Sequence, residues 1–210
     1  MPTAAAVEPP APGHDAGAAM ASSPIHDPGL VTLSMAVDPG DPVPMRIVTE
    51  KSSGELSKKG YTGQGIDVAL IDSGVAPVAG LDQADKIVYG PDLSNEATVP
   101  NLANLDTYGH GTHLAGIIAG DDGDQVGGIA PDSRIVSLKV AGATGETNMA
   151  QVVAAIDWVV EHKNDNGLNI RVLNLSLGVP GVTSSVNDPF SAAVERAWDA
   201  GLVVVAAAGN

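Results

Sequence analysis

From residue 66 onwards, five short apolar runs recur along the chain, each bounded by glycine, proline or aspartate. Valine, isoleucine and leucine dominate them without polar alternation, as in strands covered on both faces of a parallel sheet. Two intervening segments repeat apolar residues at helical spacing instead. The predicted strands span 66–72, 86–92, 134–140, 171–178 and 202–210, and the predicted helices span 147–163 and 188–200. This alternation predicts an α/β fold, with a mostly parallel sheet flanked by helices.

The first 45 residues have a different character. They are rich in alanine, proline, glycine and aspartate, as in the opening "MPTAAAVEPPAPGHDAG", and they offer little apolar surface to bury. Prolines also interrupt regular structure. We therefore expect residues 1–45 to form a flexible extension and residues 46–210 to form one domain. The opening lacks the basic and leucine-rich regions of a signal peptide.

Composition narrows the choice of partner. The formal net charge is −15 and the isoelectric point is near 4.3, whereas nucleic acids and anionic membrane surfaces require a basic patch. We therefore expect neither as a partner. The chain has no cysteine, which excludes disulfides, thiolate metal sites and cysteine nucleophiles. No apolar run approaches the length of a membrane span.

Polar residues stand near the ends of three predicted strands. Asp72 ends the first, Ser176 lies near the end of the fourth, and Asn210 ends the fifth. Functional groups of parallel α/β sheets gather at these carboxyl ends. Taken alone, Asp72 is also explained as a cap for the Ser-Gly turn that follows it.

The stretch "YGHGTHLAGIIAG" places His110 and His113 three residues apart at the start of a predicted helix. Zinc-binding histidines on a helix usually stand four apart with a glutamate between them, so a metal site is disfavoured. Two interpretations remain: the histidines pack in the core, or His110 is a catalytic base. For catalysis, Asp72 would orient His110 as the base, and the amide of Asn210 would donate to an oxyanion. Glycines on both sides of His110 would let a substrate backbone approach.

Four segments together resemble the subtilisin-like serine peptidases. They are "DVALIDSGV" (67–75), "GHGTHLAGIIAG" (109–120), "VLNLSLG" (172–178) and "VVVAAAGN" (203–210), and the resemblance runs from about Gly63 to Asn210. It implies a serine endopeptidase that cleaves peptide bonds with an Asp-His-Ser triad, in which Asp72 orients His110 and Asn210 is an oxyanion donor. No cofactor is required for this chemistry.

The same resemblance implies a binding site for an extended polypeptide. Ser176, Leu177 and Gly178 would pair with the substrate, and the segment 142–147, which contains Gly145, would run along its other side. Ala207, Ala208 and Gly209 would form one wall of the pocket for the residue before the cut. His113 would lie deeper than His110, in a structural role.

The family's nucleophile stands in a Gly-Thr-Ser-Met-Ala segment that this sequence lacks; "TLSMAV" at 32–37 lies before Asp72 and is read as coincidence. We therefore expect a fold incomplete at its C-terminal end, truncated before the serine, monomeric and inactive alone. The family also implies secretion. A structural calcium ion is a candidate for the acidic loop 119–128 together with Asp82, against a solvated turn.

Two other functions fit the sequence less well. A non-catalytic, peptide-binding relative of the subtilases would not need Asp72, His110 and Asn210 together. A dinucleotide-binding domain is suggested by "GQG" at 63–65, but a phosphate-binding glycine loop must follow a strand, and this one precedes it.

Overall fold

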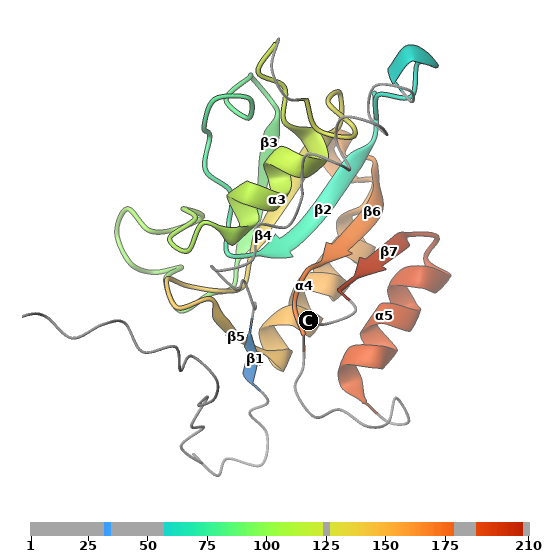
Figure 1. The fold of residues 1–210 in the computed structure, drawn as a ribbon. Coiled ribbons are helices and arrows are strands. Elements are labelled where there is room, and N and C mark those ends of the chain that lie inside the picture. Colours follow the sequence, from blue (N-terminus) through green and yellow to red (C-terminus); the bar gives the residue numbers. More distant parts are fainter. Residues whose placement is uncertain (1–31, 35–56, 124–126, 179–187, 208–210) are drawn as a thin grey trace, which may run out of the picture.

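The computed structural model describes residues 32–34, 57–123, 127–178 and 188–207. At its centre lies a five-stranded parallel sheet with the order β3-β4-β2-β6-β7 (Figure 1). Its strands are β2 (Asp67–Asp72), β3 (Ile87–Asp92), β4 (Arg134–Lys139), β6 (Ile170–Leu175) and β7 (Val203–Ala206). The predicted parallel sheet is confirmed, although the last two strands end earlier than expected.

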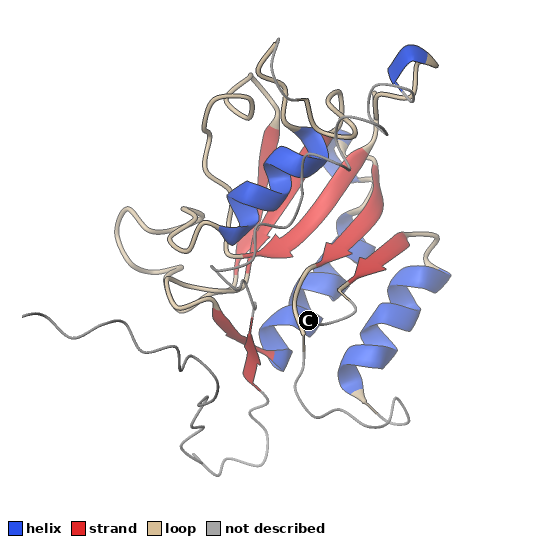
Figure 2. Cartoon of the chain, in the orientation of Figure 1, coloured by secondary structure: helices blue, strands red, loops and turns tan. Residues whose placement is uncertain are grey.

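Helices cover both faces of this sheet (Figure 2). They are α3 (His110–Ala119), α4 (Met149–His162) and α5 (Pro189–Asp199), and a short 3-10 helix, η2 (Asp165–Gly167), follows α4. Strand β2 shows the two faces clearly, because successive side chains of a strand point to opposite sides. Ala69 and Ile71 belong to the core cluster with α4 and α5, whereas Val68 and Leu70 pack in the cluster with α3.

Local sequence explains where α4 and α5 begin. Asn148 accepts a hydrogen bond from the backbone N–H of Gln151, and the Gln151 side chain accepts one in return from the backbone N–H of Asn148. Asp188 accepts from the backbone N–H of Ser191, and Pro189 occupies the first helical position. Both helices therefore start where their side chains satisfy the free N–H groups of the first turn.

A second, two-stranded antiparallel sheet lies beside the main one. It pairs β1 (Thr32–Ser34) with β5 (Glu146–Asn148), so that Leu33 lies opposite Thr147 (Figure 1). The expectation that residues 1–45 lack regular structure is thus wrong for these three; the others lie outside the described residues. A three-residue strand is not stable alone, and here it pairs with the free backbone edge of β5.

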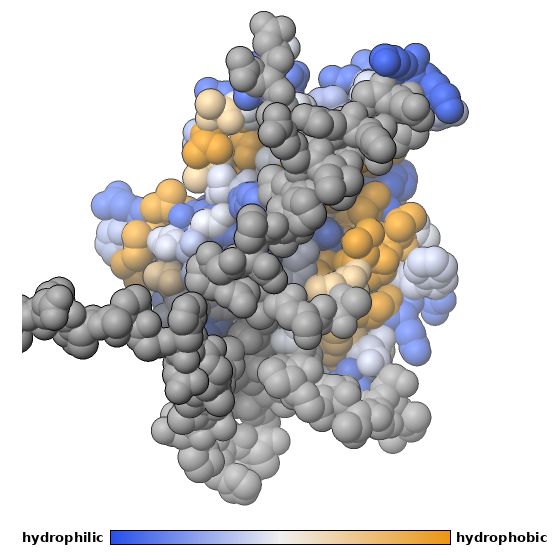
Figure 3. All heavy atoms as spheres, viewed as in Figure 1, coloured by the Kyte–Doolittle hydropathy of each residue, from blue (hydrophilic) through white to orange (hydrophobic). Residues whose placement is uncertain are grey.

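Part of the sheet's α3 face carries exposed apolar side chains. Val204 packs into the core with α4 and α5, so Val203 and Val205 point to the opposite face, where they are 54% and 47% exposed. Figure 3 shows hydrophobic side chains gathered over β6 and β7 on this side. None of the helices in the described ranges is long and apolar enough to cross a bilayer.

Candidate active site

Asp72 and His110 meet at the carboxyl end of β2. Asp72 is fully buried and ends the strand, and His110 is the first residue of α3. Nδ1 of His110 lies 2.9 Å from each carboxylate oxygen of Asp72, and the backbone N–H of Ser73 donates to Oδ1 at 2.8 Å. An ionised carboxylate only accepts, so the proton of this bond resides on Nδ1. Nε2 then has its lone pair available as a base.

The glycines around His110 allow this contact. Gly109 has a φ of 98°, which L side chains rarely adopt. A Cβ atom on Gly111 would lie 2.1 Å from the carbonyl oxygen of Gly74 and 3.1 Å from Oδ1 of Asp72. Helix α3 can therefore approach the end of β2 only without a side chain at Gly111. The sequence suggested access for a substrate backbone as the reason for these glycines. The structure adds a packing reason for Gly111 and a conformational reason for Gly109.

Burial and charge act in opposite directions on His110, whose side chain is 10% exposed. Burial alone would lower the pKa of His110, but the hydrogen bond and charge of Asp72, together with the charge of Asp106, outweigh it. The pKa of His110 is therefore raised above its ordinary value. Since a base must be neutral to accept a proton, the imidazole of His110 is available as a base only above this raised pKa.

This shift predicts a pH-dependent contribution to stability. Because the pKa is higher in the folded state, His110 stabilises the fold fully below the ordinary histidine pKa and loses this effect as pH rises through the raised value. The free energy of unfolding of the native chain minus that of His110→Gln should therefore fall with rising pH. Urea unfolding between about pH 5 and 9 measures it. A difference independent of pH would contradict the raised pKa.

His113 does not lie deeper than His110, so that expectation is wrong. The buried residues of α3 are Gly111, Ala115 and Ala119, which share one helical face. His113 follows Gly111 by two residues, about 200° around the helix, and is exposed on the far side. It lines a cavity of about 490 Å³ together with Leu81 and other residues.

Gly145 lies close to the Asp72–His110 pair, with the ring of Tyr108 between them. It is buried with a φ of 72°, and a Cβ atom there would come within 2.7 Å of the ring of Tyr108. The ring centroids of Tyr108 and His110 are 6.5 Å apart. The segment predicted to bind substrate therefore packs against Tyr108, whose ring lies near His110.

The remaining substrate-binding candidates follow β6 and β7 at the same edge of the sheet. Ser176 is half-buried and its hydroxyl oxygen accepts a hydrogen bond from Nδ2 of Asn174, whereas Gly178 is exposed. Leu177 is only 5% exposed and its side chain belongs to the core, which leaves its backbone for the predicted pairing with a substrate. Ala207 is exposed, and its N–H donates to the carbonyl of Leu175. Ala208, Gly209 and Asn210 lie outside the described residues.

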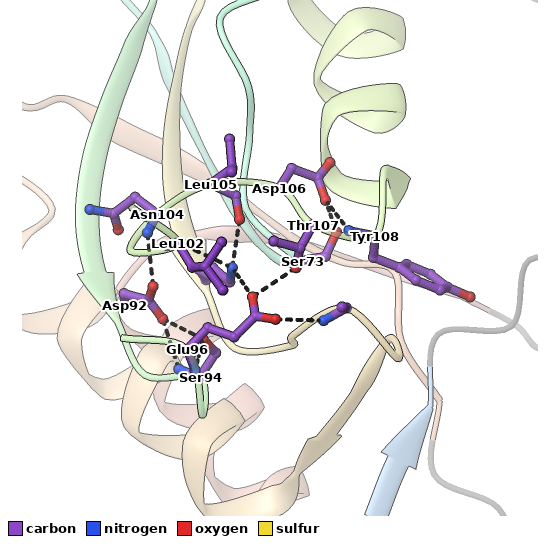
Figure 4. A network of polar contacts seen from close by, with 12 residues as sticks. Ser73, Asp92, Ser94, Glu96, Leu102, Asn104, Leu105, Asp106, Thr107 and Tyr108 are labelled. Atoms are coloured by element: carbon purple, nitrogen blue, oxygen red, sulfur yellow. Dashed lines mark hydrogen bonds and ion pairs between the residues drawn. The ribbon is translucent and has the colours of Figure 1, made fainter. Parts of the chain in front are cut away.

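A polar network around the end of β4 was not predicted from the sequence (Figure 4). Lys139, the last residue of β4, is fully buried and donates to Glu96 at 2.6 Å and to the carbonyl of Leu105 at 2.5 Å. Glu96 also accepts from the Thr107 hydroxyl and the backbone N–H of Ala143. The network thus joins the loop before His110 to the segment 142–147. The available signal was a charged residue at the end of a strand that was predicted to be buried.

The acidic loop was the candidate site for calcium, and its described residues lie around Asp82. Asp82, Asp121 and Asp122 line one shallow pocket, where the Gln83 side chain donates to the carbonyl of Asp121 at 2.5 Å. No group of three or more His, Cys, Asp or Glu side chains within those ranges could hold a metal ion. The calcium candidate therefore gains no support, and residues 124–126 of its loop lie outside the described ranges.

Comparison with known proteins agrees with this geometry. Residues 63–210 match the model of the subtilase family. The chain is 34% identical over 155 residues to the serine protease AprX of Bacillus subtilis (strain 168). The matched region covers 71% of this chain and 34% of AprX. It is 34% identical over 158 residues to subtilisin DY of Bacillus licheniformis, and this match covers 74% of this chain and 51% of subtilisin DY. The minor extracellular protease Epr of Bacillus subtilis (strain 168) is 33% identical over 154 residues, and this match covers 73% of this chain and 21% of Epr.

Among solved structures, a cold-adapted subtilisin-like serine proteinase matches with a TM-score of 0.54 and 29% identity. The match covers 71% of this chain and 48% of that one. The chain therefore spans about half, or less, of the length of these relatives. With the family model matched over residues 63–210 and an aspartate–histidine pair at the end of the first core strand, this chain belongs to the subtilase family.

Proposed function

We propose that this chain supplies the Asp-His part of a serine-type endopeptidase. The observation that carries the proposal is the contact of Nδ1 of His110 with both oxygens of Asp72, at 2.9 Å each. Burial of Asp72 excludes water from this bond and so favours a single tautomer of His110. Family membership supports the same chemistry.

In this mechanism each residue has a defined task. Asp72 holds the proton on Nδ1 and stabilises the imidazolium that forms when Nε2 accepts the proton of a serine hydroxyl. His110 then passes that proton to the leaving amine of the cleaved peptide. By resemblance to the family, the side-chain amide of Asn210 donates a hydrogen bond to the oxyanion of the tetrahedral intermediate. These roles require neutral His110 before each cycle, and activity should therefore rise as pH passes its pKa.

The substrate in this proposal is an extended polypeptide. Strand β5 already accepts an antiparallel strand, since β1 pairs with it over three residues. Such pairing uses backbone groups and tolerates many side chains, as in other cases of strand addition. The chain direction of β1 runs along β5 towards Gly145, which contacts Tyr108 beside His110. A substrate strand bound to β5 in the same direction would approach the catalytic pair.

Because β1 uses the edge of β5 that a substrate needs, weakening β1 should strengthen peptide binding. The double variant Thr32→Pro/Leu33→Pro removes the backbone N–H groups of both residues. The N–H groups of neighbouring strand residues point to opposite edges, so one of the two lost groups faces β5. We expect an extended peptide to bind about tenfold more tightly, since it no longer competes with a tethered strand. Isothermal titration calorimetry measures the affinity.

The matched control is Thr32→Ser/Leu33→Val, which keeps both N–H groups. It should bind the peptide as the native chain does. Hydrogen exchange of the β5 amides, Glu146–Asn148, should be faster only in the proline variant. Equal peptide affinity in all three chains would show that β1 does not compete with substrate.

The peptidase proposal itself is tested with the longest polypeptide that the gene encodes. It should hydrolyse a fluorogenic peptide and be labelled by a fluorophosphonate, which reacts with an activated serine. Both signals should increase together with pH, as neutral His110 becomes available. Peptide binding without hydrolysis or labelling would instead identify a non-catalytic peptide-binding protein.

We also infer export from the cell. The support is a similar protein, Epr, whose name describes it as extracellular. Fractionation of the source cells tests this inference, with the protein expected in the medium. Accumulation inside the cells would contradict it.

A further inference from the structure

Asp106 lies in the loop before α3, four residues ahead of His110 (Figure 4). Its Oδ1 atom accepts from the backbone N–H groups of Gly109 at 2.7 Å and Tyr108 at 3.1 Å. Its Oδ2 atom accepts from the N–H of Thr112 at 2.8 Å and from the Thr112 hydroxyl at 2.5 Å. The residue that caps α3, Gly109, has no side chain, so Asp106 takes over the capping of free N–H groups at this helix start.

Asp106 also reaches the end of β2 through Ser73. The Ser73 hydroxyl lies 2.8 Å from Oδ1 of Asp106 and 3.2 Å from Oδ1 of Asp72, and it accepts from the N–H of Gly111 at 3.0 Å. A hydroxyl has a single proton, and the shorter contact assigns it to Asp106. Asp106 therefore links the strand that carries Asp72 to the first turn of the helix that carries His110.

The charge of Asp106 acts on the same histidine. A protonated side chain at the N-terminus of a helix is disfavoured by the helix dipole, and His110 occupies the first position of α3. Asp106 places a negative charge at that end, and its charge contributes to the raised pKa of His110. The ionisable groups facing His110 in the described residues are Asp72, Asp106 and, across the ring contact, Tyr108.

We propose that Asp106 is a positioning residue for His110: it fixes the start of α3 against Ser73, so that Nδ1 of His110 faces Asp72. The effect on catalysis rests on the proposed peptidase function. The effect on His110 does not, because the Asp72–His110 contact is present in this chain whether or not it cleaves peptides.

The test replaces Asp106 in the 210-residue chain. Asp106→Asn keeps the shape of the side chain but loses the charge and half of its accepting capacity. Titration of His110 by NMR should give a lower pKa, and the proton on Nδ1 should exchange with water about tenfold faster, as expected on weakening of a charge-assisted hydrogen bond. Where the protein hydrolyses peptides, kcat should fall while KM stays unchanged, because no contact with the substrate is lost.

Asp92→Asn is the matched control. Asp92 also accepts backbone N–H groups, those of Ser94 and Asn104, but it touches neither Ser73 nor α3 in the contacts of Figure 4. It should leave the pKa and proton exchange of His110 unchanged. Equal effects of the two substitutions, or an Asp106→Asn chain with native His110 behaviour, would overturn the proposal.

A second variant covers the case in which Asp106→Asn does not fold. Ser73→Ala removes the link between Asp106 and β2 and the acceptor of the Gly111 N–H, but it keeps the hydrogen bonds that Asp106 accepts from Gly109 and Thr112. It should also speed exchange of the Nδ1 proton, and native exchange in Ser73→Ala would count against the proposal. Failure of the peptidase function would appear separately, as absence of peptide hydrolysis by a chain whose His110 titration depends on Asp106.

Discussion

Replacing His110 by alanine should lower kcat for peptide hydrolysis by about six orders of magnitude, the loss known for the corresponding change in subtilisin itself. Without the imidazole, nothing accepts the proton of the attacking serine, and the remaining rate comes from binding and oxyanion stabilisation. The measurement is hydrolysis of a fluorogenic peptide by the longest polypeptide that the gene encodes, together with fluorophosphonate labelling. Both should be lost in parallel.

His113→Ala is the control for that experiment. His113 belongs to the same helix but is exposed on the side away from β2, so its removal should leave kcat within a factor of about two. If His110→Ala retained activity, or if His113→Ala lost as much, the assignment of His110 as the base would be wrong.

Asp72→Asn keeps the imidazole of His110 but changes which of its two nitrogens carries the proton. The asparagine amide can donate to Nδ1, which would leave the proton on Nε2 and block its role as base. We expect kcat to fall by about four orders of magnitude while the geometry of the site is kept. A native-like His110 titration in this variant would contradict the contact that the structure shows.

Lys139→Met should destabilise the protein by about 3–5 kcal/mol. Lys139 is fully buried, and its ammonium group contacts Glu96 and the carbonyls of Leu102 and Leu105. Burial alone would raise the pKa of Glu96, but its hydrogen bonds, that from Lys139 first, lower it, so the carboxylate is charged. Removing the lysine leaves the charge of Glu96 without its counter-ion, and it leaves the two carbonyls without the ammonium group that donates to them. Urea unfolding measures the loss.

Two further variants make this prediction specific. Lys59→Met removes an exposed lysine and should change the free energy of unfolding by less than about 0.5 kcal/mol. The double variant Lys139→Met/Glu96→Gln removes both charges and should recover part of the loss, because no unpaired charge remains. If the single and double variants were equally unstable, the ion pair would not explain the effect.

Secondary structure was predicted well from the sequence where a run of neighbouring residues is buried. The apolar runs of β2 and β4 and the helical spacing of apolar residues in α4 and α5 were sufficient to predict these elements and the parallel sheet. The pair β1–β5 was not predictable, because three-residue strands have no measurable periodicity. Their pairing joins residues more than a hundred positions apart.

By itself, the sequence determined the fold class, the family and the two residues of the candidate pair, because strand ends and the segment "GHGTH" are local signals. The tertiary structure alone decided how these residues are held. The exposure of His113 depends on which helical face α3 turns to the sheet, and the roles of Gly111, Asp106 and Lys139 depend on partners in other segments. Contacts between distant segments arise only when the chain has folded, and no local pattern records them.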